Sequence, residues 1–305
     1  MNRRHLRACR VVSDRLYPWV VRVAWAALPF TAGPALASAL HRHHTVRTAA
    51  SVALWAVWAL TLVAALVAHP ISLTVLRTVA PAAVAAMLAA TADGHASGGL
   101  LAVGLAWAAV AALLALLPAT AMIFVNGPAY PNERRFPLAV PGPVLIGPLE
   151  LSWALTIGLP AASVLLLADR RWLLGGLSTA MAAAAVWVLG RAIHGLSQRW
   201  IVFVPAGLVL HDPLSLQDPV LFERRVIEHL GPAPASTDSL DLTQRAFGLA
   251  LELVLTEKVP MVRVQPGRRD GDSGASARLL FTPTRPGAVL AWARDRRLPV
   301  SLPTT

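Results

Sequence analysis

The chain contains very little cysteine, lysine and acidic charge, and these shortages exclude whole classes of site. Cys9 is the single cysteine in 305 residues, so neither an intramolecular disulfide nor a cysteine-rich metal site can form. A chain with so little cysteine is usual for a protein that faces a reducing compartment. Lys258 is the single lysine, and charged residues make up only 14% of the chain against 56% hydrophobic residues.

Charged residues are missing from long stretches between residues 23 and 190. A membrane-spanning helix needs about 20 apolar residues, and six segments meet or approach that length. The predicted spans are residues 23–40, 48–68, 71–92, 99–125, 151–168 and 172–190. Arg77 interrupts the third of them, but a single Arg near a helix end can extend to the membrane surface. The pattern therefore predicts a transmembrane bundle.

Arginine collects ahead of the first predicted span. Residues 1 to 22 hold six Arg against one Asp, a bias that keeps the N-terminus in the cytoplasm. With six spans, both termini are then cytoplasmic in a multi-pass protein of the cell membrane. The inner side would hold Arg77, Arg134, Arg135, Arg191 and Arg199, and the outer side Arg42, Arg47, Arg170 and Arg171. If the segment with Arg77 does not cross, the C-terminal segment lies outside.

A secretory signal is the alternative interpretation of the start of the chain. Ala35, Leu36 and Ala37, ahead of Ser38, resemble a small-residue cleavage site. The basic lead of 22 residues is long for such a signal, and Pro29 and Pro34 would break its apolar region. A retained first span is therefore favoured. After cleavage, the five remaining spans would still leave the C-terminal segment inside.

The net charge of +11 would suggest nucleic acid as a partner in a soluble protein. Basic residues outnumber acidic ones six to one in residues 1 to 22, seven to four in 23 to 190, and fourteen to eleven in 191 to 305. Arg at span ends sets topology and meets anionic headgroups, and the C-terminal segment has no concentrated basic stripe. We therefore expect the lipid bilayer as a partner and no nucleic acid.

The spans show few signs of a transport pathway. A transporter usually carries buried ionisable side chains, broken helices or an internal repeat. Arg77 is the one charge inside a predicted span, and Glu150 lies at the edge of another. A pair of these two lining a cavity is the less favoured alternative to separate contacts with the headgroups. Small residues four apart in the fourth and sixth spans favour close helix packing.

Outside the spans, no group of residues has the spacing of a known catalytic or metal site. His41, His43 and His44 form a cluster, but three ligands so close in sequence rarely complete a tetrahedral metal site, so a solvated loop is favoured. Residues 126 to 150, rich in Pro and Gly, are the longest loop between spans and the most plausible place there for a partner contact. No nucleophile, phosphate-binding loop or metalloprotease motif occurs. We assign no catalytic, cofactor-binding or metal-binding residue and expect neither a cofactor nor an enzyme.

Residues 191 to 305 change to strand-like patterns. Two apolar runs in residues 199 to 212 flank residues 205 to 207 as a hairpin signal. Further strands are predicted at residues 220–227, 249–255, 259–264 and 278–282, with a second turn at 256–258 and a mobile polar turn at 267–277. Pro286 suits the first turn of a helix through Arg297. The expected covered face of that helix contains Val289, Leu290, Trp292 and Ala293.

The start and end of this segment carry a resemblance to a known family. With RWIVFVPAGLVLHD at residues 199–212 and RLLFTPTRPGAVLAWARDRR at 278–297, residues 199 to 298 resemble the bacterial pleckstrin-homology-like (PH-like) domains that follow transmembrane helices. The whole chain looks like multi-spanning actinobacterial proteins of unknown function. The resemblance supplies no site residues. Arg224 and Arg225 are the nearest candidates for a basic lipid-binding pocket, and a solvated strand end is the favoured interpretation of them.

The sequence as a whole predicts a basic cytoplasmic segment in residues 1–22, an all-α transmembrane helical bundle of six spans in 23–190, and a small mainly-β, PH-like cytoplasmic domain with a C-terminal helix in 191–305. Its expected function is that of a non-catalytic integral membrane protein for assembly or interaction, with a membrane or cytoplasmic protein partner whose identity is open. The alternative is a small-molecule or lipid transporter with a regulatory cytoplasmic domain.

Overall fold

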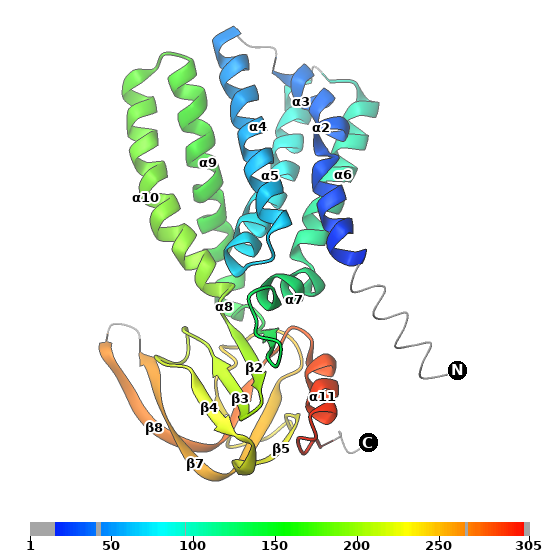
Figure 1. Cartoon of the computed structure of the whole chain (residues 1–305). Helices are drawn as coiled ribbons and strands as arrows, with labels where there is room; N and C mark the ends of the chain where they lie inside the picture. The colour runs from blue at the N-terminus through cyan, green and yellow to red at the C-terminus, as the bar shows by residue number, and fades with distance from the viewer. Residues whose placement is uncertain (1–15, 41–43, 95, 266–267, 302–305) are drawn as a thin grey trace. The chain divides into compact units, whose positions relative to one another are not determined.

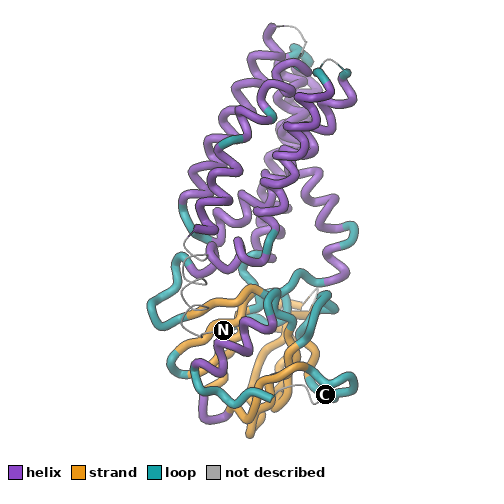
Figure 2. Tube along the Cα trace, turned by 90° about the vertical axis from the view of Figure 1, so that its right-hand side faces the viewer, coloured by secondary structure: helices purple, strands orange, loops and turns teal. Residues whose placement is uncertain are grey.

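A computed structural model represents the chain and describes residues 16–40, 44–94, 96–265 and 268–301 (Figure 1). The chain divides into two compact units. One comprises Met1–Gly127 and Ser152–Gly190, and the other comprises Pro128–Leu151 and Arg191–Thr305. The first unit is helical, whereas the second contains the strands and the terminal helix α11 (Pro286–Asp295), as Figure 2 shows by colour.

Six helical stretches among the described residues are long and apolar enough to cross a membrane. The first, Leu16–Ala39, contains α2 (Leu28–Thr31) and α3 (Gly33–Ala39). The others are α4 (His44–Leu66), α5 (Pro70–Asp93), α6 (Gly98–Leu116), α9 (Pro148–Ala168) and α10 (Trp172–Leu196). The predicted six apolar helices are therefore confirmed, and the chain has the build of a multi-pass membrane protein.

The fourth span is shorter than the predicted residues 99 to 125. α6 ends at Leu116, and α7 (Pro118–Asn126) begins a new helix after the break at Leu117. Pro118 has no N–H for the carbonyl of Leu114, and the Thr120 hydroxyl donates to that carbonyl at 2.5 Å instead. The 19 residues of α6 extend about 28 Å, close to the hydrocarbon thickness of about 30 Å. The break therefore falls at one end of the span.

A second proline creates a bond between two spans. Pro29 leaves the carbonyl of Trp25 without its usual helical donor. The Trp58 indole N–H donates to that carbonyl at 3.1 Å, and the Trp25 indole N–H donates to the Trp58 carbonyl at 3.0 Å. The Trp107 indole makes a similar bond to the Ala24 carbonyl at 2.8 Å. Such bonds satisfy polar groups that water cannot reach in hydrocarbon.

Among its described residues, the second unit contains two four-stranded sheets. The first has the order β1 (Arg134–Pro137), β2 (Trp200–Val204), β3 (Gly207–His211) and β4 (Val220–Glu223), all antiparallel. The second has the order β5 (Ile227–Pro232), β7 (Leu251–Gln265), β8 (Arg268–Phe281) and β6 (Leu240–Asp241), with β6 parallel to β8. The predicted hairpin at residues 199–212 is confirmed as β2 and β3.

The first strand of this unit comes from the loop between the fourth and fifth spans. β1 pairs with β2, placing Phe136 opposite Ile201. Phe136 is 3% exposed and packs edge-on against Phe203, with ring centroids 5.6 Å apart. The sequence analysis did not anticipate this strand. It requires the loop and the C-terminal segment to lie on the same side of a membrane, and the two spans α9 and α10 between them meet that condition.

Three predicted strand boundaries are wrong. The strand expected at residues 220–227 ends at Glu223, where the short 3-10 helix η1 (Arg224–Val226) leads into β5. Residues 256–258, expected as a turn, lie inside β7, whose register shifts between Val254 and Val259. Most of residues 267–277, expected as a mobile turn, lie inside β8, because pairing with β7 satisfies the backbone whatever the polarity of the side chains. Residue 267 itself lies outside the described residues.

The predicted terminal helix is confirmed as α11, although it ends at Asp295 rather than Arg297. Pro286 is its first residue, and Val289, Leu290 and Ala293 are buried. Trp292, also expected on the covered face, is half-buried, and the guanidinium groups of Arg134 and Arg296 each lie 5.6 Å from the centroid of its ring. Cations over an aromatic face attract it electrostatically, so these contacts help to hold α11 beside β1.

Candidate functional site

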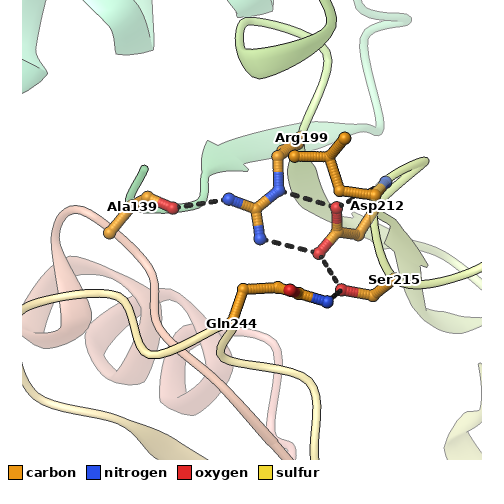
Figure 3. A network of polar contacts seen from close by, with 6 residues as sticks. Ala139, Arg199, Asp212, Ser215 and Gln244 are labelled. Atoms are coloured by element: carbon orange, nitrogen blue, oxygen red, sulfur yellow. Dashed lines mark hydrogen bonds and ion pairs between the residues drawn. The ribbon is translucent and has the colours of Figure 1, made fainter. Parts of the chain in front are cut away.

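Arg199 and Asp212 form an ion pair in the interior of the second unit (Figure 3). Their side chains are only 2% and 1% exposed. Arg199 Nε donates to Asp212 Oδ1 at 2.6 Å, and Nη2 donates to Oδ2 at 2.8 Å. This two-bond geometry matches the planar guanidinium to the carboxylate and is stronger than a single contact.

The β2–β3 hairpin places these two charges together. Trp200 lies opposite His211 in the sheet, so Arg199, just before β2, faces Asp212, just after β3. Arg199 was predicted among the arginines of the inner side and at the start of the hairpin, and the structure places its side chain in the interior of the second unit, the β unit (Pro128–Leu151 and Arg191–Thr305). The available signal was its symmetric spacing with Asp212 about the predicted turn. That signal has meaning only once the strand register is known.

Neighbouring polar groups complete the network in Figure 3. Arg199 Nη1 donates to the carbonyl of Ala139 at 2.7 Å, and the Ser215 hydroxyl donates to Asp212 Oδ2 at 2.8 Å. The side-chain amide of Gln244 donates to Ser215 Oγ at 3.1 Å. The ion pair therefore fastens three segments together: the inter-span segment, the β2–β3 hairpin and the loop before β7. Both charges are matched within the fold, which favours a structural role.

The loop between β6 and β7 has an unusual backbone. Gln244 and Arg245 have φ values of 55° and 54°, a region that residues other than glycine rarely adopt. The Thr243 N–H donates to Asp241 Oδ1 at 2.8 Å, and the Arg245 N–H donates to Thr243 Oγ1 at 3.2 Å. Strained backbone persists only where its surroundings hold it, and it concentrates at functional positions. This loop is therefore the strongest candidate for a functional segment in the second unit.

Glu252 in β7 is another buried charged group, 6% exposed. The hydroxyl of Thr237 donates to its Oε1 at 2.7 Å, and that of Ser239 donates to the same atom. Burial alone would raise the pKa of Glu252. The two hydroxyl hydrogen bonds, together with the nearby Arg278 and His229, lower this pKa below its ordinary value. Ionised Glu252 therefore anchors the segment that leads into β6.

Arg77 and Glu150, the candidate pair for a membrane cavity, each contact backbone groups. Arg77 Nε donates to the carbonyl of Ala115 at 3.4 Å, and Nη2 donates to that of Leu116 at 3.3 Å. These carbonyls end α6, where a cation also interacts favourably with the helix dipole. Glu150 Oε2 accepts from the N–H of Gly147 at 2.7 Å, at the start of α9.

Arg22 makes the same kind of contact at the end of α4. Its Nε and Nη2 donate to the carbonyls of Ala65 and Leu66, both at 3.1 Å. Arg22 and Arg77 are the seventh and eighth residues of their own membrane-length helices, and each caps a helix that ends beside it. Arginines that the sequence indicated as topology signals therefore also stabilise helix ends.

The histidine cluster falls largely outside the described residues, which exclude His41 and His43, while His44 begins α4. Within the part of the chain that the structure describes, no group of three or more His, Cys, Asp or Glu side chains is placed to hold a metal ion.

The two arginines considered for a lipid pocket, Arg224 and Arg225, have partners in the protein. Arg224 Nη2 donates to the carbonyl of Arg297 at 3.1 Å and also to that of Arg296, just beyond the end of α11. Arg225 pairs with Glu223 at 2.7 Å in an exposed ion pair. Arg224 therefore holds the two residues that follow α11, whereas Arg22 and Arg77 donate to carbonyls of the last residues within their partner helices.

No model of a known protein family, no curated protein and no solved structure matches this chain. Over the residues that it describes, the structure has six membrane-length apolar helices and a mainly-β unit with a C-terminal helix.

Proposed function

We propose that this chain is a non-catalytic membrane protein whose β unit mediates protein contacts or assembly at the cytoplasmic face of the cell membrane. We further propose that the β unit is a PH-like domain. One sheet of four sequential antiparallel strands, a second sheet with the antiparallel neighbours β5, β7 and β8, and a closing helix support this assignment. Its first strand, β1, would then be supplied by the segment between the fourth and fifth spans.

The origin of β1 is the observation that carries the functional proposal. The chain passes between membrane helices and the β unit three times: after α7, before α9 and after α10. A tail attached by one linker rotates freely, whereas three covalent connections restrict its orientation. A domain held in this way loses less entropy when a partner binds, which suits a module that presents a surface.

The buried charges support the same proposal. Arg199 and Asp212 cross-link segments of the β unit, and Glu252 anchors another segment. Each is bonded to protein groups, in the manner of residues that maintain a fold. These contacts would then keep the module rigid.

Affinity purification from native membranes tests the proposal. A tagged full chain is compared with a chain truncated after Leu196, with membrane fractionation as the control that both are inserted. We expect a protein that copurifies with the full chain and is lost on truncation. A partner retained by the truncated chain, or no partner after mild cross-linking, would contradict the assignment of contacts to the β unit.

The alternative is transport of a small molecule or lipid, with the β unit as a regulatory module. Breaks in the first stretch and after α6 favour it, because transporters use discontinuous helices. Ala108, fully buried in the middle of α6, offers a test. In a Cys9→Ser background, Ala108→Cys should resist a water-soluble thiol reagent in a dry bundle. Rapid labelling would favour transport.

A further inference from the structure

The β unit reaches the start of a membrane span through α8 (Gly142–Leu145). Only Ile146 and Gly147 separate α8 from α9, so Leu145 lies at most about 11 Å from the first residue of the span. Leu145 is 37% exposed and Ile146 is 72% exposed. Wherever α9 enters the bilayer, these two apolar side chains must lie close to the membrane surface.

A second segment, distant in sequence, is held against α8. Gly142 lies against the carbonyl of Arg245, and a Cβ at Gly142 would lie 3.6 Å from the Phe247 ring. This close approach requires glycine at position 142. The loop before β7 therefore packs against the helix that leads into the span. The side chains of this loop therefore lie beside α8, close to the membrane surface.

This loop exposes large apolar side chains, although hydrogen bonds and neighbouring residues hold its backbone in place. Phe247 is 64% exposed and Leu249 is 50% exposed, with Arg245 also on the surface. The backbone around them is held by the left-handed residues Gln244 and Arg245 and by the bond from Gln244 to Ser215. A rigid loop that keeps an aromatic ring in water loses the free energy of its burial unless another phase covers it.

We propose that the loop and α8 together contact the boundary between headgroups and acyl chains, in the leaflet where α9 begins. The contact comprises Leu145, Ile146, Arg245, Phe247 and Leu249. Lipid is the occupant because the span attached to α8 brings the bilayer to this surface. Aromatic rings favour that boundary, and Arg meets anionic headgroups there. The proposal needs only α9 as a span and is independent of the assembly function.

Depth-dependent quenching in the full chain tests this contact. In a Cys9→Ser background, Phe247→Cys and Leu249→Cys each carry an environment-sensitive fluorophore, and Leu221→Cys on β4 is the matched control. Leu221 is an exposed apolar residue, at 43%, in the same unit. The chain is reconstituted in vesicles of phosphatidylcholine and phosphatidylglycerol that contain a lipid with a nitroxide near its headgroup.

Because interfacial segments are buried only roughly 5–10 Å, the shallow nitroxide should lower emission at positions 247 and 249 at least about twofold more than at position 221. A nitroxide at the end of the acyl chain should quench less. The control carries the same dye, so affinity of the dye for lipid cannot produce the difference. Equal quenching at all three positions, or none at both 247 and 249, would overturn the proposal.

Discussion

Removing β1 should destabilise the β unit severely, although no residue of the C-terminal segment is changed. The comparison uses two soluble fragments. One contains residues 197–305 alone, and the other joins residues 128–147 to residues 197–305 through a flexible Gly/Ser linker. The sequence alone predicts that the first fragment folds independently. The structure shows that it lacks the strand paired with β2.

The size of the effect follows from the contacts that are lost. Phe136 and Leu138 are 3% and 5% exposed, and burial of each contributes about 1.5–3 kcal/mol. The edge-on contact of Phe136 with Phe203 adds about 0.5–1.5 kcal/mol. Buried Arg199 also loses the carbonyl of Ala139, a charged hydrogen bond worth about 1.5–3 kcal/mol. The loss is a large part of the 5–15 kcal/mol that is typical of a domain.

Urea unfolding followed by circular dichroism measures this difference. The fragment with β1 should unfold cooperatively, and the fragment without it should unfold at much lower urea or without a clear transition. In the fragment with β1, Phe136→Ala should cost about 3–5 kcal/mol. Arg225→Ala, at a side chain 79% exposed, is the control that should change little. Equal midpoints for the two fragments would refute the reasoning.

Three further predictions concern topology, a helix cap and pH. A fluorescent protein fused after residue 198 should be bright and an exported phosphatase there inactive; the reverse would place the β unit outside and identify the segment with Arg77 as one that fails to cross. Arg77→Lys should leave abundance in the membrane almost unchanged, because an ammonium can still donate to the carbonyls at the end of α6. Arg77→Leu should cost about 1 kcal/mol of stability in thermal unfolding. A larger loss of stability in the Lys variant than in the Leu variant would argue against capping. The pKa of Glu252 is lowered in the folded state, so the stability that its ionised form contributes is present above the unfolded pKa of about 4.3 and is lost as pH falls through the folded pKa. Glu252→Gln should therefore be less stable than the parent at pH 7 and should approach the stability of the parent in acid. A constant difference in stability at every pH would contradict this.

Much of the secondary structure was predictable where one physical rule dominates. Membrane spans follow from length and the absence of charge, and the β2–β3 hairpin follows from two apolar runs around a turn. The prediction was wrong where tertiary pairing overrides local preference. Residues 267–277 look like a turn by composition, yet β7 supplies a partner strand and draws most of them into β8. The end of α6 at Leu116 could not be predicted from hydropathy, because the residues on both sides of Pro118 are apolar.

The candidate site was much less predictable than the fold. Arg199 and Arg77 both resemble topology signals in the sequence, because Arg has the same appearance whether it meets a headgroup, a carboxylate or a helix end. Only the positions of Asp212 and of the α6 carbonyls distinguish these cases. The exposed ring of Phe247 carries no sequence signal, since its meaning comes from Gly142, about a hundred residues earlier.

The sequence by itself determined that this chain enters a membrane and that its last third changes to β structure, because hydrophobic burial and backbone hydrogen bonding in lipid depend on composition along short segments. Only the tertiary structure decided that β1 belongs to the β unit, that Arg199 and Asp212 are paired in its interior, and that Phe247 is held beside α8. Those arrangements depend on contacts between segments far apart in the chain, which local pattern does not encode.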